Sequence, residues 1–102
     1  MSAHQYRITV EYLGGKHAGP ELHPPLVFET GNHDDLFRII EAVEAARLFD
    51  RDTSAALVVG MKLFSEVMLK HKNDPLFVSM LAAYRDYIGP FKARLEEAAP
   101  QA

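Results

Sequence analysis

The sequence predicts an α+β domain with the element order β-β-α-α-α. Three observations predict it. Residues 4–13 alternate between apolar and polar side chains, residues 14–25 are dense in Gly and Pro, and from residue 33 onward apolar side chains recur at helical spacing. We expect an antiparallel two-stranded ribbon packed on three helices. Two strands alone are marginal in water and leave open edges, so dimerisation could extend the ribbon into a larger sheet.

The size of the chain fits one domain. Its 102 residues are 48% hydrophobic and 25% charged, which is ordinary for a globular protein able to bury one core. We expect a single globular domain over residues 1–98 and a frayed C-terminal tail over residues 99–102.

Charge and cysteine content restrict the possible functions. The formal net charge of −3 argues against sequence-independent binding of nucleic acid, which needs a basic face. The absence of cysteine removes disulfides, thiolate metal sites and cysteine nucleophiles. The N-terminus lacks the pattern of a signal peptide, and the longest apolar run, Ala55 to Met61, is far shorter than the roughly 20 residues of a membrane helix. We therefore expect a cytoplasmic protein with neither nucleic acid nor membrane as a partner.

The two strands are predicted from period-two patterning. The segment "HQYRITVEYL", His4 to Leu13, places one set of side chains on a buried face and the other in water. The side chains expected on the buried face are Tyr6, Ile8, Val10 and Tyr12, and those expected on the solvent-exposed face are Arg7, Thr9 and Glu11. A second strand, Leu26 to Thr30, is expected to pair antiparallel with the first across the Gly/Pro-rich loop.

Three helical segments follow. The first is predicted over about His33 to Arg47 and the second over about Thr53 to His71. The second is unusually apolar, with a stripe formed by Leu57, Met61, Phe64 and Met68, so we expect it to be central or to face a partner. The third is predicted to begin at Asn73-Asp74-Pro75 and to stop near Gly89-Pro90, with one or two further turns possible before the end.

Polar residues precede each helix. In "NHDDLF", Asn32 is the expected N-cap of the first helix, with Asp35 in its first turn at the N3 position. Asp52 and Asp74 are the expected capping residues of the second and third helices. The alternative is a metal site built from Asn32, His33, Asp34 and Asp35, which is disfavoured because adjacent helical residues do not face one another.

Histidines offer a second candidate metal site. His17 and His23 share the loop, and His33 would approach them if the loop folded back. Imidazole is a common zinc ligand, so a site of three histidines is conceivable. Their spacing matches no established pattern, and solvated loop histidines are the favoured interpretation.

No catalytic set can be assembled from the sequence. Ser54, Ser65 and Ser79 lie outside any nucleophile-elbow motif, and no phosphate-binding loop is present. Glu66 would be a candidate acid or base if it were buried. Its flanking Lys62 and Lys70, each four residues away, favour a solvated ion-pair face instead.

Aromatic residues of the third helix form one further candidate. Tyr84, Tyr87 and Phe91 share a face, and with Tyr6 and Tyr12 they could line a pocket for a small planar ligand. Ordinary core packing is the favoured interpretation, and the same holds for Met61 and Met68.

Three segments together resemble a small bacterial family known only as a domain of unknown function. They are "YRITVE" at Tyr6 to Glu11, "NHDDLF" at Asn32 to Phe37, and "VGMKLFSEVMLKHKNDPLF" at Val59 to Phe77. The resemblance covers nearly the whole chain. It implies a bacterial, stand-alone, cytoplasmic protein and assigns no activity, cofactor or site residue.

The favoured function is a protein-interaction module acting as a homodimer, with an unidentified protein as a further conceivable partner. The alternative is a small-molecule or metal-binding protein that uses the loop histidines or the aromatic face. An enzyme is the least favoured class, and we expect no cofactor.

Overall fold

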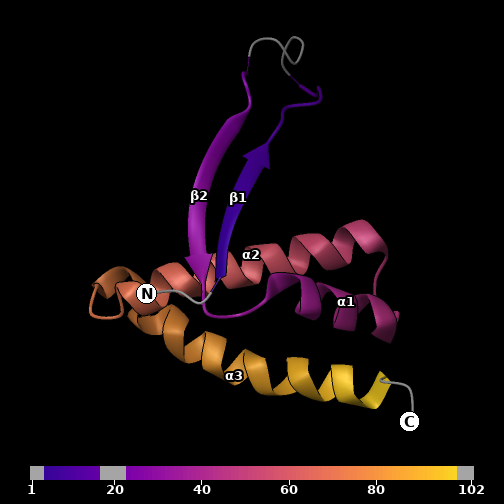
Figure 1. Ribbon diagram of the computed structural model, residues 1–102. Helices are drawn as coiled ribbons and strands as arrows, with labels where there is room; N and C mark the ends of the chain where they lie inside the picture. The colour runs from indigo at the N-terminus through magenta and orange to yellow at the C-terminus, as the bar shows by residue number, and fades with distance from the viewer. Residues whose placement is uncertain (1–3, 17–22, 99–102) are drawn as a thin grey trace. The chain divides into compact units, whose positions relative to one another are not determined.

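The computed structural model describes residues 4–16 and 23–98. Contacts within the chain divide it into two compact units, Met1–His33 and Asp34–Ala102, called here the ribbon unit and the helical unit. Two antiparallel strands are followed by three helices, which confirms the predicted α+β class and the order β-β-α-α-α (Figure 1). The predicted tail, residues 99–102, lies outside the described residues.

The ribbon unit consists of β1, His4–Val10, and β2, Leu26–Asn32. The register pairs His4 with Asn32 at one end and Val10 with Leu26 at the other. β1 is three residues shorter than the alternation predicts, because the ladder ends at the Val10–Leu26 pair and Glu11 to Leu13 have no partner residue in β2. β2 is two residues longer than predicted, because Gly31 and Asn32 still pair with β1.

The two faces of the ribbon differ as the alternation predicts. Arg7 and Glu29 lie opposite one another on the polar face, where Arg7 Nη2 is 2.6 Å from Glu29 Oε2. The other face carries the apolar pairs Ile8–Phe28 and Val10–Leu26. This face is not fully buried: Val10 is 53% exposed, Leu26 59% and Phe28 38%.

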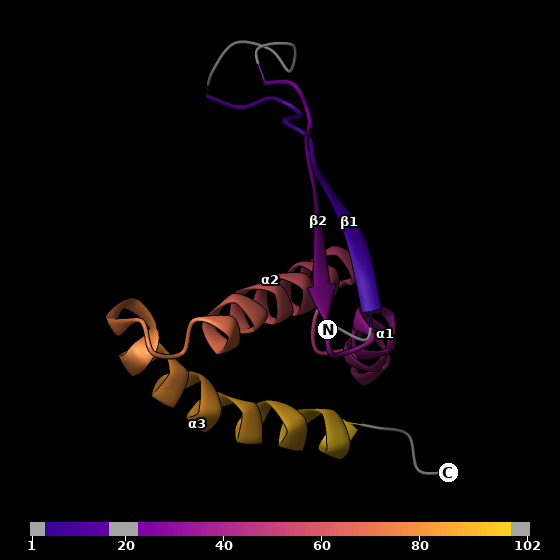
Figure 2. The same ribbon diagram turned by 60° about the vertical axis from the view of Figure 1, so that its left-hand side comes forward.

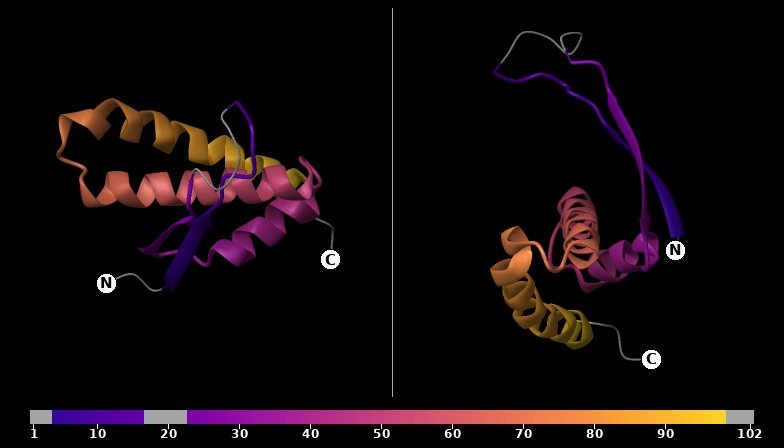
Figure 3. Two further views of the ribbon diagram at one scale, coloured as in Figure 1. Left: turned by 90° about the horizontal axis from the view of Figure 1, so that it is seen from above. Right: turned by 90° about the vertical axis from the view of Figure 1, so that its left-hand side faces the viewer.

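The helical unit consists of α1, Leu36–Ala46, α2, Arg51–Lys70, and α3, Pro75–Ala98. α2 and α3 run antiparallel and are joined by a short turn, while α1 crosses them obliquely (Figure 3). All three helices contribute to its core, whose buried apolar side chains are Leu36, Val43, Ala46, Val58, Met68 and Leu81.

α1 begins three residues later than predicted, and its N-cap is Asp35 rather than Asn32. Asn32 keeps an extended backbone because it is the last residue of β2 and pairs with His4. The Asp35 carboxylate accepts a hydrogen bond from the Phe37 backbone N–H at 3.1 Å, which satisfies one of the free donors of the first turn. At the other end, Arg47 terminates the helix in the left-handed conformation, with φ 55°.

The caps of the other two helices are also aspartates. α2 begins at Arg51, so Asp50 is its N-cap and its carboxylate accepts from the Thr53 N–H at 2.7 Å. Asp52, the residue predicted to cap α2, lies inside the first turn, where its negative charge interacts favourably with the helix dipole. Asp74 directly precedes α3, and its carboxylate accepts from the Leu76 N–H at 2.9 Å.

α3 does not stop at Gly89-Pro90 but continues to Ala98 with Pro90 inside it (Figure 2). A proline within a helix removes one backbone hydrogen bond and crowds the carbonyl four residues earlier. The apolar pattern outlasts this local cost, since Phe91 and Leu95 are partly buried and continue the stripe formed by Leu81, Tyr84 and Ile88. The predicted stop is therefore wrong, because packing of this stripe outweighs the Gly-Pro signal.

Candidate functional site

An apolar groove lies between α2 and α3. Its volume is about 500 Å³. The residues that line it are Ala56, Leu57, Gly60, Met61 and Phe64 from α2, and Met80, Ala83, Tyr84 and Tyr87 from α3. The size and the apolar lining fall within the range of ligand and peptide sites in proteins. We call this feature the α2–α3 groove.

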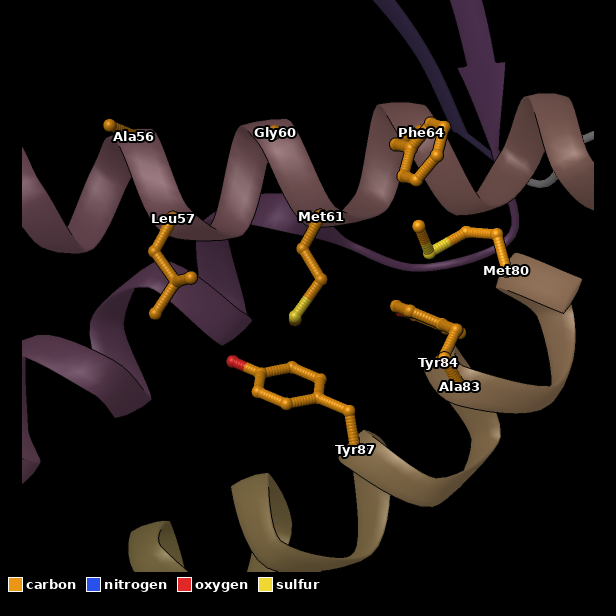
Figure 4. Close-up of a pocket in the computed structure, with 9 residues that line it drawn as sticks. All are labelled: Ala56, Leu57, Gly60, Met61, Phe64, Met80, Ala83, Tyr84 and Tyr87. Atoms are coloured by element: carbon orange, nitrogen blue, oxygen red, sulfur yellow. The ribbon is translucent and has the colours of Figure 1, made fainter.

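Small residues on both helices border the groove. A Cβ atom added at Gly60 would meet no atom within 4 Å, and Ala56 and Ala83 are further small residues in the lining. Larger side chains project into this space, where Met61 of α2 and Tyr87 of α3 point toward one another and Phe64 faces Met80 (Figure 4). The groove is therefore a surface bounded by flexible and aromatic side chains.

A second cavity of about 310 Å³ continues the groove toward the C-terminal half of α3. It shares Leu57 and Tyr87 with the first, and its other lining residues are Leu48, Phe49, Pro90, Phe91 and Arg94. Because two wall residues are shared, the two cavities form one elongated apolar depression, with Arg94 among the residues that line it.

The predicted aromatic face of α3 lies at this depression. Tyr87 stacks on Phe91 with ring centroids 5.9 Å apart, and Tyr84 and Tyr87 are 6.5 Å apart. The Tyr84 hydroxyl is buried and has no hydrogen-bond partner among the described residues. Tyr6 and Tyr12 have contacts inside the ribbon unit, to His4 and His23 respectively.

The two described histidines of the predicted metal site lie apart. His23 precedes β2, with its ring 4.6 Å from that of Tyr12, whereas His33 follows the other end of the same strand. The seven-residue length of β2 separates them by roughly 20 Å. His17 lies outside the described residues. Within residues 4–16 and 23–98, no group of three or more His, Asp or Glu side chains is placed to hold a metal ion.

The cluster Asn32-His33-Asp34-Asp35 is also dispersed. Asn32 is 2% exposed at the end of β2, and Asp35 caps α1. Asp34 forms an ion pair with Lys62 of α2, 2.9 Å between Oδ2 and Nζ. Asn32, Asp34 and Asp35 therefore lie in three different environments and do not converge.

Glu66 is buried, contrary to the predicted solvent-exposed position. It is 5% exposed, and therefore does not belong to a solvated ion-pair face with Lys62 and Lys70. Lys62 is directed instead to Asp34, in the segment before α1, a contact that the spacing within α2 cannot indicate.

The serines of α2 have structural roles. Ser54 and Ser65 are buried, and their hydroxyls donate to the carbonyl oxygens of Phe49 at 3.4 Å and Lys62 at 3.2 Å. Hydroxyls that are bonded to backbone carbonyls and enclosed by packing are not positioned as nucleophiles.

The sequence pattern did not reveal the α2–α3 groove. The available signal was the set of small residues Ala56, Gly60 and Ala83 beside an apolar stripe, which is equally typical of close helix packing. Only the separation of the two helices shows that these positions border open space.

The fold and the groove define a small α+β protein with an apolar surface depression in its helical unit. The chain belongs to the DUF3861 family, a domain of unknown function with a solved structure, whose family model matches residues 4–93. This membership confirms the resemblance found in the sequence.

One solved structure shares most of the chain. It is a protein of unknown function from Pectobacterium atrosepticum, 33% identical, which covers 88% of this chain and 97% of its own with a TM-score of 0.76. No curated protein matches the chain. None of the described helices combines the length and the apolar character that crossing a membrane requires.

Proposed function

We propose that this protein is an interaction module that acts as a homodimer. The observation that carries the proposal is the ribbon, a two-stranded sheet whose apolar face leaves Val10, Leu26 and Phe28 between 38% and 59% exposed. A two-stranded ribbon is marginal in water unless other elements or strands cover it. A second copy that pairs along an open edge would remove that edge and join the two short ribbons into one larger sheet.

A matched pair of variants tests the role of the ribbon. Val10→Lys places a charge on the apolar face, whereas Val78→Lys makes the same change on α3 at a position of similar exposure, 58% against 53%. In sedimentation equilibrium over a concentration series, we expect Val10→Lys to shift toward monomer and Val78→Lys to behave like the unmodified chain. Equal dimerisation of Val10→Lys and the unmodified chain would contradict a role for this face.

The α2–α3 groove supports a second candidate function, binding of a small apolar molecule. The supporting observation is the groove itself, about 500 Å³ in volume and lined by methionine, aromatic and small side chains. An aromatic or aliphatic ligand would fill this space against those side chains.

A groove-filling substitution separates this candidate from non-specific adsorption. Ala83→Trp would occupy the groove, whereas Ala82→Trp adds the same side chain at an exposed neighbouring position outside it. With anilinonaphthalene sulfonate as the probe, we expect fluorescence enhancement in the unmodified chain and Ala82→Trp, and its loss in Ala83→Trp. Undiminished enhancement in Ala83→Trp would place the probe elsewhere.

A further inference from the structure

The first strand carries a charge pattern that extends beyond its pairing in the hairpin. Arg7, Thr9 and Glu11 follow one another on the polar face of the alternating segment. Arg7 already contacts Glu29 of β2, through Nε at 3.1 Å and Nη2 at 2.6 Å. Glu11 is exposed and lies just past the end of β1, so the opposite charges at positions 7 and 11 flank Thr9 symmetrically.

β1 also has an open edge. The sheet consists of β1 and β2, so among the described residues no third strand pairs with the outer edge of β1. The alternation of side chains continues past the last pair of the ladder, Val10–Leu26, through Glu11 to Leu13, which have no partner residue in β2. A strand that pairs along this edge would extend the ladder over a segment whose sequence already has the strand pattern.

We infer that two copies of this chain pair their β1 strands antiparallel, with Thr9 on the two-fold axis. This inference rests on the proposed homodimer and specifies its interface. Thr9 then lies opposite Thr9 of the partner subunit, and Arg7 lies opposite Glu11 of the partner subunit, twice by symmetry. Each Arg7 also keeps Glu29, so a row of three alternating charges crosses the new interface.

Charge selects this register among the neighbouring ones. Opposite residues must share a face, so each symmetric antiparallel register places one residue on the axis. Arg7 or Glu11 on the axis would oppose like charges, which destabilises a sheet. Ile8 or Val10 on the axis leaves Arg7 opposite Thr9 or Leu13 of the partner subunit. The Thr9 register alone joins opposite charges.

The apolar face supports the same register. With Thr9 on the axis, Ile8 lies opposite Val10 of the partner subunit. Since Ile8 pairs with Phe28 and Val10 with Leu26 inside each hairpin, an uninterrupted apolar row crosses all four strands. The outer strand β2 offers no comparable pairing, because Glu29 is its single charged residue and two prolines precede it.

A cysteine crosslink tests the register directly, because the chain has no cysteine of its own. Directly opposite residues of antiparallel strands have Cα atoms about 4.5–5.5 Å apart, within the range that a disulfide spans. Thr9→Cys should therefore form a covalent dimer with oxidised glutathione. Thr30→Cys, the same change on β2, should remain uncrosslinked because three strand spacings separate it from its symmetry mate.

The outcomes distinguish this inference from the proposed homodimer. Failure of Thr9→Cys to crosslink, while sedimentation shows that the unmodified chain is a dimer, would overturn the register and leave the dimer standing. Equal crosslinking of Thr30→Cys would also overturn the register. A monomeric unmodified chain would overturn both.

Charge reversal gives an independent test. Glu11→Arg opposes Arg7 of the partner subunit and should raise the dimer dissociation constant about tenfold or more. Glu41→Arg, the same reversal on α1, should leave that constant unchanged. The triple variant Arg7→Glu, Glu11→Arg, Glu29→Arg inverts the whole charge row and should restore dimerisation. Equal effects of Glu11→Arg and Glu41→Arg, or no recovery in the triple variant, would overturn the inference.

Discussion

Two methionines on one stripe of α2 provide a direct test of whether the α2–α3 groove is surface or core. Met61 and Met68 are seven residues apart, two helical turns, so their side chains leave the helix in nearly the same direction. Met68 is 0% exposed, whereas Met61 is partly exposed and borders the groove. Truncating each to alanine removes the same atoms from two different environments.

The expected costs follow from what each truncation leaves behind. Met68→Ala creates a cavity enclosed by the helical core, and such changes cost about 2–5 kcal/mol. Met61→Ala leaves space that opens into the groove, so it loses only part of the transfer free energy of the side chain, about 1–2 kcal/mol. Met68→Ala should therefore be the more destabilising variant, and a difference of about 1 kcal/mol suffices to tell the two apart. That difference corresponds to a further fall of roughly 4–8 °C in the melting temperature.

Urea unfolding followed by far-UV circular dichroism measures both free energies of unfolding. The unmodified chain and both variants are compared at one protein concentration, because the stability of an oligomer depends on concentration. Equal losses in the two variants would mean that Met61 is core and that the groove is closed in solution. A larger loss for Met61→Ala would refute the assignment of Met68 to the core.

Two further predictions concern the backbone and the caps. Gly60→Ala should raise the free energy of unfolding by about 0.5–1 kcal/mol, because the new Cβ meets no neighbour and alanine favours helix. Gly14→Ala should lower the free energy of unfolding, because Gly14 has a φ of +129° that alanine rarely adopts. Thermal melts in which both variants shift in the same direction would contradict this prediction. The hydrogen bonds from Thr53, first its side chain and then its backbone N–H, lower the pKa of Asp50 below its usual 3.8. The charged cap therefore stabilises the fold above pH 3.8, and this contribution is lost as the pH falls through the folded-state pKa. Melting temperatures measured from neutral to acidic pH should fall less steeply in Asp50→Asn than in the unmodified chain. Parallel curves of melting temperature against pH would contradict the role of Asp50 as the charged N-cap of α2.

Much of the fold could be predicted from the sequence because local patterns and packing agree. The alternation from His4 onward and the helical stripes of α1 and α2 give the element order without ambiguity. Boundaries fail where a long-range contact decides them. Asn32 and Asp35 are both good N-caps by residue type, and only the pairing of Asn32 with His4 assigns the cap to Asp35.

At the end of α3, a local stop signal conflicts with the apolar stripe, and the stripe decides where the helix ends. Gly89-Pro90 is a strong local stop signal, yet the helix passes through it to Ala98. Gly89 does not take the positive φ of a helix terminator. The apolar residues Phe91 and Leu95, which repeat the spacing of the preceding stripe, indicate continuation, and a count of that stripe would have extended the predicted helix.

The candidate site was less predictable than the fold. The aromatic residues Tyr84 and Tyr87 could be identified from their spacing, but whether they face core or groove depends on the distance between α2 and α3. The histidine hypothesis rested on a loop folding back, and the length of β2 keeps His23 and His33 apart. Proximity in sequence carries little information about such convergence.

The mass of the unmodified chain in solution tests the central proposal, self-association, most directly. Multi-angle light scattering across a range of concentrations measures it without labels or substitutions. The proposal predicts a mass that approaches twice 11.4 kDa as the concentration rises through the micromolar range. A constant mass of 11.4 kDa at every concentration would contradict it.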